Sequence, residues 1–172
     1  MQMTTAELRS LMPSAIAWAK AQQRLVLQHG ACLTESQLAL AQLAGVRRPG
    51  MIRILVVPAI PMPEEKALRR AATNHLFPKV IHGLTLGYGI YLQRCAAHLR
   101  PLQAHEFRHV HQYEQYPTLE AGLARFLGDV RARGANAPHE IDARKFEGEI
   151  RAAMGTTDIP AVVRPGVWFS PV

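Results

Sequence analysis

Residues 103–114 read QAHEFRHVHQYE and contain the pattern H-E-x-x-H, formed by His105, Glu106 and His109. On a helix, residues four apart lie on one face, so the two imidazoles can point at the same metal ion. Glu106 stands one position after the first histidine, where its carboxylate can reach a metal-bound water and accept a proton. We therefore predict a helix that carries a metal site, and we call it the motif helix.

Two prolines set the predicted limits of the motif helix. Pro101 suits a first helical turn, where the N–H that proline lacks is not needed, and Pro117 cannot continue a helix. The motif helix is therefore predicted to run from Pro101 to Tyr116.

Two further helices are predicted after the motif helix. Thr118 is a typical N-cap for a helix over residues 119–133, which Gly134 ends. A proline-containing loop follows, and residues 139–154 again carry apolar side chains at helical spacing. If this last helix folds back antiparallel to the motif helix, its first turn comes close to the metal site.

The chain is predicted to begin with a long helix. Residues 4–28 carry apolar side chains at helical spacing, and Thr4 and Glu7 match a capping box. Pro13 lies inside this segment and predicts a break or kink, with the main helix beginning near Ser14.

Three shorter elements are predicted next. A capping-box pattern at Thr34 and Gln37 favours a helix over residues 35–44. Residues 51–57 are rich in β-branched side chains and predict a strand. Residues 64–72 predict a short helix, with Pro63 at its start and acids in its first turn.

Residues 80–92 are predicted to form one or two strands interrupted by Gly83, Gly87 and Gly89. The glycines are compatible with a bulge, a hairpin bend or a close approach of another backbone. Either the segment is simply a glycine-loosened strand, or it is an edge strand that offers backbone groups to an extended peptide.

The composition is that of a globular chain with a basic surface. It has 172 residues, 48% of them hydrophobic and 19% charged, with a net charge of +7. The basic residues occur as two short pairs, at 47–48 and 69–70, and are otherwise scattered, which disfavours nucleic-acid binding. The sequence holds no run of eighteen apolar residues, so no membrane span is expected.

The two cysteines favour a reducing compartment. Cys32 and Cys95 are far apart and form no C-x-x-C pattern, so we expect two free, mostly buried thiols. The first ten residues do not resemble a signal peptide. A cytoplasmic location is therefore expected.

The third ligand of the predicted metal site is open from the residues alone. Catalytic zinc usually takes three protein ligands and one water. Glu140, at the start of the last predicted helix, is one candidate, and Asp142, His139 and His111 are its rivals. His111 stands two residues after His109 and therefore lies on a different face of the motif helix.

Three segments together resemble the gluzincin metallopeptidases, especially their minimal forms. The segment 105–112 is similar to the family pattern H-E-x-x-H-V-x-Q. The glycine-bearing segment 84–92 resembles the strand that precedes this helix, and Glu140-Ile141-Asp142-Ala143 resembles the later segment that supplies a glutamate ligand. The resemblance covers residues 79–153.

This resemblance implies a Zn²⁺-dependent hydrolase that cleaves a peptide or protein substrate. His105, His109 and Glu140 would be the zinc ligands, and Glu106 would be the general base that activates a zinc-bound water. A donor to the tetrahedral oxyanion is also needed. The candidates for it are Tyr88, Tyr116, Arg144 and His139.

The predicted fold class is α+β, with a small β-sheet packed on a helical bundle that contains the motif helix. The resemblance implies that this is a zincin-like core. We expect one domain over residues 1–172, with N-terminal helices and a first strand at 1–78, the core at 79–153 and an extended tail at 154–172.

Two other interpretations compete with the metallopeptidase. The same residues are compatible with a non-catalytic zinc-binding module that serves interaction or regulation. They are also compatible with an exposed helical pair of histidines that holds no metal.

Overall fold

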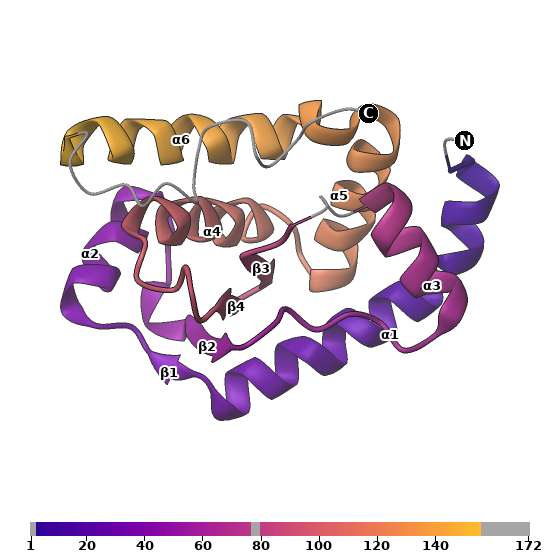
Figure 1. Cartoon of the computed structure of the whole chain (residues 1–172), viewed down its shortest axis with the longest axis horizontal. Helices are drawn as coiled ribbons and strands as arrows, with labels where there is room; N and C mark the ends of the chain where they lie inside the picture. Colours follow the sequence, from indigo (N-terminus) through magenta and orange to yellow (C-terminus); the bar gives the residue numbers. More distant parts are fainter. Residues whose placement is uncertain (1–2, 77–79, 156–172) are drawn as a thin grey trace.

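The computed structural model describes residues 3–76 and 80–155. Within this part the chain forms six α-helices and one four-stranded sheet, so the predicted α+β class is confirmed (Figure 1). The predicted extended tail lies outside the described residues beyond Gly155.

The strands are β1 (Ala31–Cys32), β2 (Arg53–Val57), β3 (Gly83–Leu86) and β4 (Gly89–Gln93). Their order in the sheet is β1-β2-β4-β3. β2 and β4 are parallel, whereas the β1–β2 and β3–β4 pairs are antiparallel. The sheet is therefore mixed, and β3 forms one of its edges in the described part of the chain.

The glycine-bearing segment forms a hairpin of β3 and β4. β3 and β4 are joined by Gly87 and Tyr88, and Gly87 has a φ of 60°, a conformation that glycine adopts without strain. Of the arrangements that the glycines allowed, the chain therefore forms the hairpin bend.

The α-helices are α1 (Thr5–His29), α2 (Glu35–Leu43), α3 (Lys66–Ala71), α4 (Arg100–Tyr113), α5 (Leu119–Arg133) and α6 (Pro138–Met154). Single turns of other helix types occur at Pro49–Met51, Ala72–Leu76 and Gly134–Asn136. Both predicted capping boxes are present, since the Thr4 and Thr34 side chains each accept from the backbone N–H three residues on.

Helix α1 continues through Pro13 rather than starting near Ser14. The ring of Pro13 is exposed, so it meets no neighbouring element, and the loss of one backbone hydrogen bond does not end a helix of 25 residues. The first turns and the rest of α1 run in different directions in Figure 1, which agrees with a kink but not with a break.

Two other predicted boundaries are wrong. Helix α3 begins at Lys66, after the two acids at 64–65, and a π-type turn extends it to Leu76. Helix α4 ends at Tyr113, where turn residues replace the last predicted helical turn before Pro117. Both thiols are free but exposed, not buried as expected, because Cys32 lies on a two-residue edge strand and Cys95 in a turn.

Helices cover both faces of the sheet (Figure 1). Because side chains alternate along a strand, Ile90 and Leu92 of β4 pack toward α2 and α4, whereas Tyr91 packs with Val26 of α1. Phe107 of α4 is fully buried in the core on the α4 side. Truncating such a side chain to alanine typically costs about 3–5 kcal/mol.

This packing fixes the rotation of α4 about its axis. With Phe107 and Val110 against the sheet, the side of the helix that carries His105 and His109 faces α5 and α6. Helix α6 runs antiparallel to α4, as contacts between Arg108 and Asp142 and between Gln112 and His139 demonstrate (Figure 1). The site therefore forms between two helices that are adjacent in space but separated in sequence by α5.

No helix in residues 3–76 and 80–155 combines the length and the apolar character that crossing a membrane requires.

Candidate metal centre

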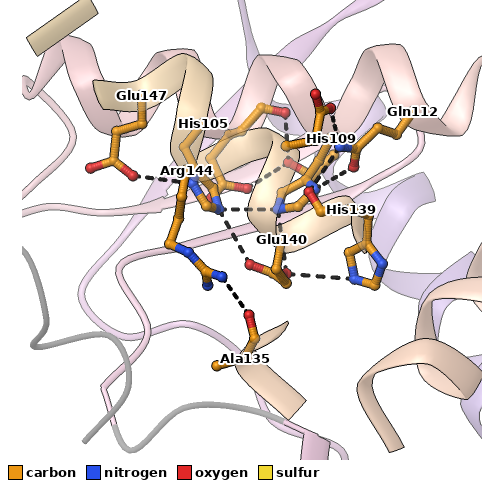
Figure 2. Close-up of polar contacts among 11 residues, drawn as sticks. His105, His109, Gln112, Ala135, His139, Glu140, Arg144 and Glu147 are labelled. Atoms are coloured by element: carbon orange, nitrogen blue, oxygen red, sulfur yellow. Dashed lines mark hydrogen bonds and ion pairs between the residues drawn. The ribbon is translucent and has the colours of Figure 1, made fainter. Parts of the chain in front are cut away.

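His105, His109 and Glu140 converge between α4 and α6, and their potential ligand atoms all lie within 4.8 Å of one another (Figure 2). The two Nε2 atoms are 3.1 Å apart. Glu140 places Oε1 3.6 Å from Nε2 of His109 and Oε2 3.8 Å from Nε2 of His105.

These separations suit a tetrahedral zinc ion. Zinc binds histidine nitrogen and carboxylate oxygen at about 2.0–2.1 Å, so neighbouring ligand atoms of a tetrahedral site lie about 3.3 Å apart. The two Nε2 atoms, 3.1 Å apart, are close to that value, and each lies 3.6–3.8 Å from its nearer oxygen of Glu140. Two imidazoles and one carboxylate are also the ligand types that zinc prefers.

Each histidine is oriented through its other ring nitrogen. Nδ1 of His105 lies 3.2 Å from Oε2 of Glu147, and Nδ1 of His109 lies 2.8 Å from Oε1 of Gln112. The amide of Gln112 donates to the carbonyl oxygen of His139, so its oxygen must face His109. In its neutral form each imidazole therefore donates from Nδ1 and presents the Nε2 lone pair that a metal requires.

The two orienting side chains are themselves held in place. Arg151 donates to Oε1 of Glu147 at 2.7 Å, one turn further along α6. Gln112 donates to Asp142 at 2.8 Å, and Asp142 forms a two-point ion pair with Arg108 at 2.7 and 3.0 Å. The helix pair thus fixes the histidines independently of a metal.

Charges around the cluster favour ionised acids. Burial acts to raise the pKa of Glu140, but the neighbouring His109 and His105 outweigh it and hold the pKa below its ordinary value. Burial likewise acts to raise the pKa of Glu147, and the hydrogen bond from His105 with the charge of Arg151 brings it below the ordinary value. Both carboxyls are therefore ionised at neutral pH.

Glu106 lies buried beside the two histidines, with 4% of its surface exposed. The hydroxyl of Thr85 on β3 donates to its Oε2 at 2.6 Å. Burial raises the pKa of its carboxyl, against the lowering effect of His105 and His109. A carboxylate whose pKa is shifted upward is suited to accept a proton near neutral pH.

The space that Glu106 occupies depends on Gly83. A Cβ atom at position 83 would lie 2.2 Å from Oε1 of Glu106. At position 83 of β3, therefore, only glycine leaves room for the Glu106 carboxylate.

The rival ligands are engaged elsewhere or lie outside the cluster. Asp142 is paired with Arg108, and Nδ1 of His111 bonds the carbonyl oxygen of Gly45 at 2.7 Å. His139 stacks on Phe126 with ring centroids 4.3 Å apart, and its Nε2 lies 3.7 Å from Oε1 of Glu140. Burial lowers the pKa of His139 to about 4, so the ring is neutral at pH 7.

Of the four candidate oxyanion donors, His139 and Arg144 border the same cavity as the cluster. The hydroxyl of Tyr88 instead donates to Glu114, at the far end of α4 from His105. Arg144 follows Glu140 by one helical turn and donates to the carbonyl oxygen of Ala135 (Figure 2).

A cavity of about 170 Å³ opens beside the cluster. His105, Glu106, His109 and Glu140 form its polar end, together with His139 and Arg144. The remainder is lined by side chains from α1, α3, β3 and α5, most of them apolar. A molecule that enters the cavity can therefore contact the candidate ligands and an apolar surface together.

Sequence reasoning did not identify the residues that orient the site. Glu147 stands seven positions after Glu140, two helical turns on the same face, so helical spacing could have indicated it. Gln112 belongs to the quoted pattern but had no assigned role. Thr85 reaches Glu106 across 21 positions, a relation that no local pattern reveals.

Comparison of the chain with protein-family models, with curated proteins and with solved structures found no match.

Proposed function

We propose that the protein is a zinc metallopeptidase of the gluzincin type, built on a zincin-like core. The observation that carries the proposal is the convergence of His105, His109 and Glu140 at zinc-like separations, with Glu106 buried beside them. The three ligands would hold the ion, which when bound would supply an acidified water and polarise a peptide carbonyl.

The residues of the chain would then perform the proton transfers. Glu106 would accept the proton of the attacking water and pass it to the leaving amine. His139 and Arg144 border the cavity and are the candidates to donate hydrogen bonds to the tetrahedral oxyanion.

The number of ligands favours catalysis over a structural role. In the described residues the grouping comprises three side chains. Structural zinc is almost always held by four protein ligands, whereas catalytic zinc keeps one position for water. The nearby His139 does not belong to the grouping, although it directly precedes Glu140 in the sequence.

The position of β3 favours a peptide as substrate. All four of its residues, Gly83–Leu86, line the cavity, and β3 is an edge of the sheet in the described part of the chain. An extended peptide could add to this edge through backbone hydrogen bonds, with a carbonyl group next to the candidate zinc site. The free thiols Cys32 and Cys95 support a reducing cytoplasm as the compartment.

Two substitutions separate this function from its alternatives. Glu106→Gln should keep one zinc per chain, measured by metal analysis, and should abolish cleavage of an unstructured protein. His109→Ala should lose zinc, whereas the matched control His111→Ala should keep it. Zinc bound by the wild type without any cleavage would favour a non-catalytic zinc module, and absence of zinc would overturn the metal site itself.

A further inference from the structure

A second pair of reactive side chains lies outside the candidate metal centre, where β3 begins and β4 ends. Cys95, in the turn after β4, is exposed, and its Sγ lies 3.9 Å from Nδ1 of His82. His82 immediately precedes β3, and Gln93 is the last residue of β4. These three residues are not among the described ones that line the cavity at the metal centre.

The backbone of the sheet fixes both members of the pair. The N–H of Gln93 donates to the carbonyl oxygen of His82 at 2.7 Å, which continues the pairing of β3 with β4 by one residue. The N–H of Ala96 donates to the carbonyl oxygen of Gln93 at 2.9 Å and closes the turn that carries Cys95. The thiol and the imidazole are therefore held beside each other by the strands.

The side chain of Gln93 determines which ring nitrogen of His82 carries hydrogen. Nδ1 of His82 lies 2.8 Å from Oε1 of Gln93. The amide nitrogen of Gln93 donates to the carbonyl oxygen of Pro58 at 3.1 Å, so the amide oxygen must face His82. A neutral His82 ring therefore carries its hydrogen on Nδ1.

This hydrogen decides what His82 can do for Cys95. A general base for a thiol needs a lone pair directed at the thiol, and Nδ1 presents an N–H instead. The arrangement therefore disfavours a cysteine nucleophile with a histidine base. It favours a thiolate at Sγ that accepts from Nδ1–H, because a donor hydrogen bonds most strongly to a charged acceptor.

We propose that Cys95 is a site of reversible modification by low-molecular-weight disulfides of the glutathione disulfide class. The Cys95 proton goes to water, and the thiolate attacks one sulfur of the reagent. The bond between Sγ and that sulfur forms, the disulfide bond of the reagent breaks, and the other half leaves as a thiolate. Cys95 is oxidised and the reagent is reduced, so no further reactant is needed.

In this reaction His82 is a positioning residue, because it donates to Sγ without transferring a proton. Exposure of Cys95 leaves room for the attached group. The modification is reversed by an excess of free thiol, as other mixed disulfides are. The proposal needs neither zinc nor peptide hydrolysis, so it stands or falls separately from the proposed function.

Cys32 provides a reference thiol in the same chain. It is also exposed, but it lies on β1, at the opposite edge of the sheet from β3. In the described part of the chain no hydrogen bond joins Cys32 to a histidine. Its cross-strand partner Arg53 donates instead to the carbonyl oxygens of Gly50 and Ile52.

Competing modification of the two thiols tests the proposal. The full chain is incubated with glutathione disulfide, and peptide mapping by mass spectrometry follows each cysteine with time. Cys95 should be modified at least about tenfold faster than Cys32, and excess reduced glutathione should restore it. Equal rates, or faster modification of Cys32, would overturn the proposal.

Variants test the part played by the imidazole. His82→Leu removes the donor and should slow modification of Cys95 at least about tenfold, while the rate at Cys32 stays unchanged and reports an intact sheet. His98→Leu, at an exposed position of the turn segment after β4, is the matched control and should react as the wild type does. An unchanged Cys95 rate in His82→Leu would overturn the role of His82.

A measurement on the wild type tests the same role without any substitution. Nitrogen NMR at neutral pH should find the His82 hydrogen on Nδ1, and the Nδ1 signal should shift when Cys95 is modified. A ring with its hydrogen on Nε2, or an Nδ1 signal that does not respond to modification, would overturn the assigned donor.

Discussion

The Nδ1 atom of His105 lies 3.2 Å from Oε2 of Glu147, two helical turns beyond Glu140 on α6 (Figure 2). One helix thus supplies both a candidate ligand and the group that orients a second ligand. Arg151 of the same helix holds the Glu147 carboxylate, so the direction of the His105 imidazole depends on α6 as a rigid unit. Such outer contacts tune metal affinity as well as geometry.

Removing this orienting acid should weaken metal binding. Glu147→Ala leaves Nδ1 of His105 without its acceptor and should lower zinc affinity about 10–100-fold. Competition with a chromophoric chelator measures the change. Glu149→Ala, at an exposed position of the same helix, is the control, and equal affinities of the two variants would contradict the assigned role.

Gly83→Ala should displace the proposed general base without removing the ligands. The new Cβ would lie 2.2 Å from Oε1 of Glu106, so the carboxylate must move. Peptide hydrolysis should fall at least about 100-fold, within the range that general-base catalysis contributes, while zinc remains bound. Gly128→Ala meets no atom within 4 Å and should leave activity unchanged.

The donor to the oxyanion can be identified by two variants. His139→Phe preserves an aromatic ring for stacking on Phe126 but removes the N–H donor. Arg144→Met keeps a long side chain without its charge. The variant that lowers kcat about 10²–10³-fold, with zinc affinity unchanged, identifies the donor. A loss of zinc in either variant would show instead that the residue supports the ligands.

Zinc should stabilise the folded chain. Free zinc at 100 times its dissociation constant adds about 2.7 kcal/mol to the free energy of unfolding. For a chain of this size that raises Tm by about 5–10 °C. Thermal unfolding with zinc or with a chelator measures the difference, and His109→Ala should abolish it. Equal Tm values in the wild type would contradict zinc binding to the folded state.

Acid should destabilise the protein in part through Glu114, which lies away from the metal centre. Burial acts to raise its pKa, but the backbone N–H of Arg47 and the hydroxyl of Tyr88 bring it below the ordinary value. A lowered folded-state pKa stabilises the protein above the unfolded value of about 4.3, and this stability is lost as pH falls through the folded-state pKa.

The expected result is a flatter pH dependence in Glu114→Gln. Its free energy of unfolding, from urea titrations between pH 7 and pH 3, should decrease less on acidification than that of the wild type. The matched control is Glu149→Gln, whose exposed carboxyl should leave the wild-type slope intact. Parallel curves for the wild type and Glu114→Gln would exclude this contribution.

The sequence by itself determined the elements whose signals are local. The spacing of His105 and His109 places them on one face of a helix wherever that helix lies, because 3.6 residues make one turn. Capping boxes and Gly134 marked helix ends for the same reason, since the groups that satisfy a helix terminus are at most a few residues away.

Tertiary structure alone decided which distant groups meet at the site. Glu140 reaches the histidines, and Asp142 does not, because α6 packs antiparallel to α4 with Asp142 directed at Arg108. The same packing brings Glu147 to His105, and the sheet brings Thr85 to Glu106. Helical periodicity sets directions within one element, whereas relations between elements depend on how all of them bury their apolar faces.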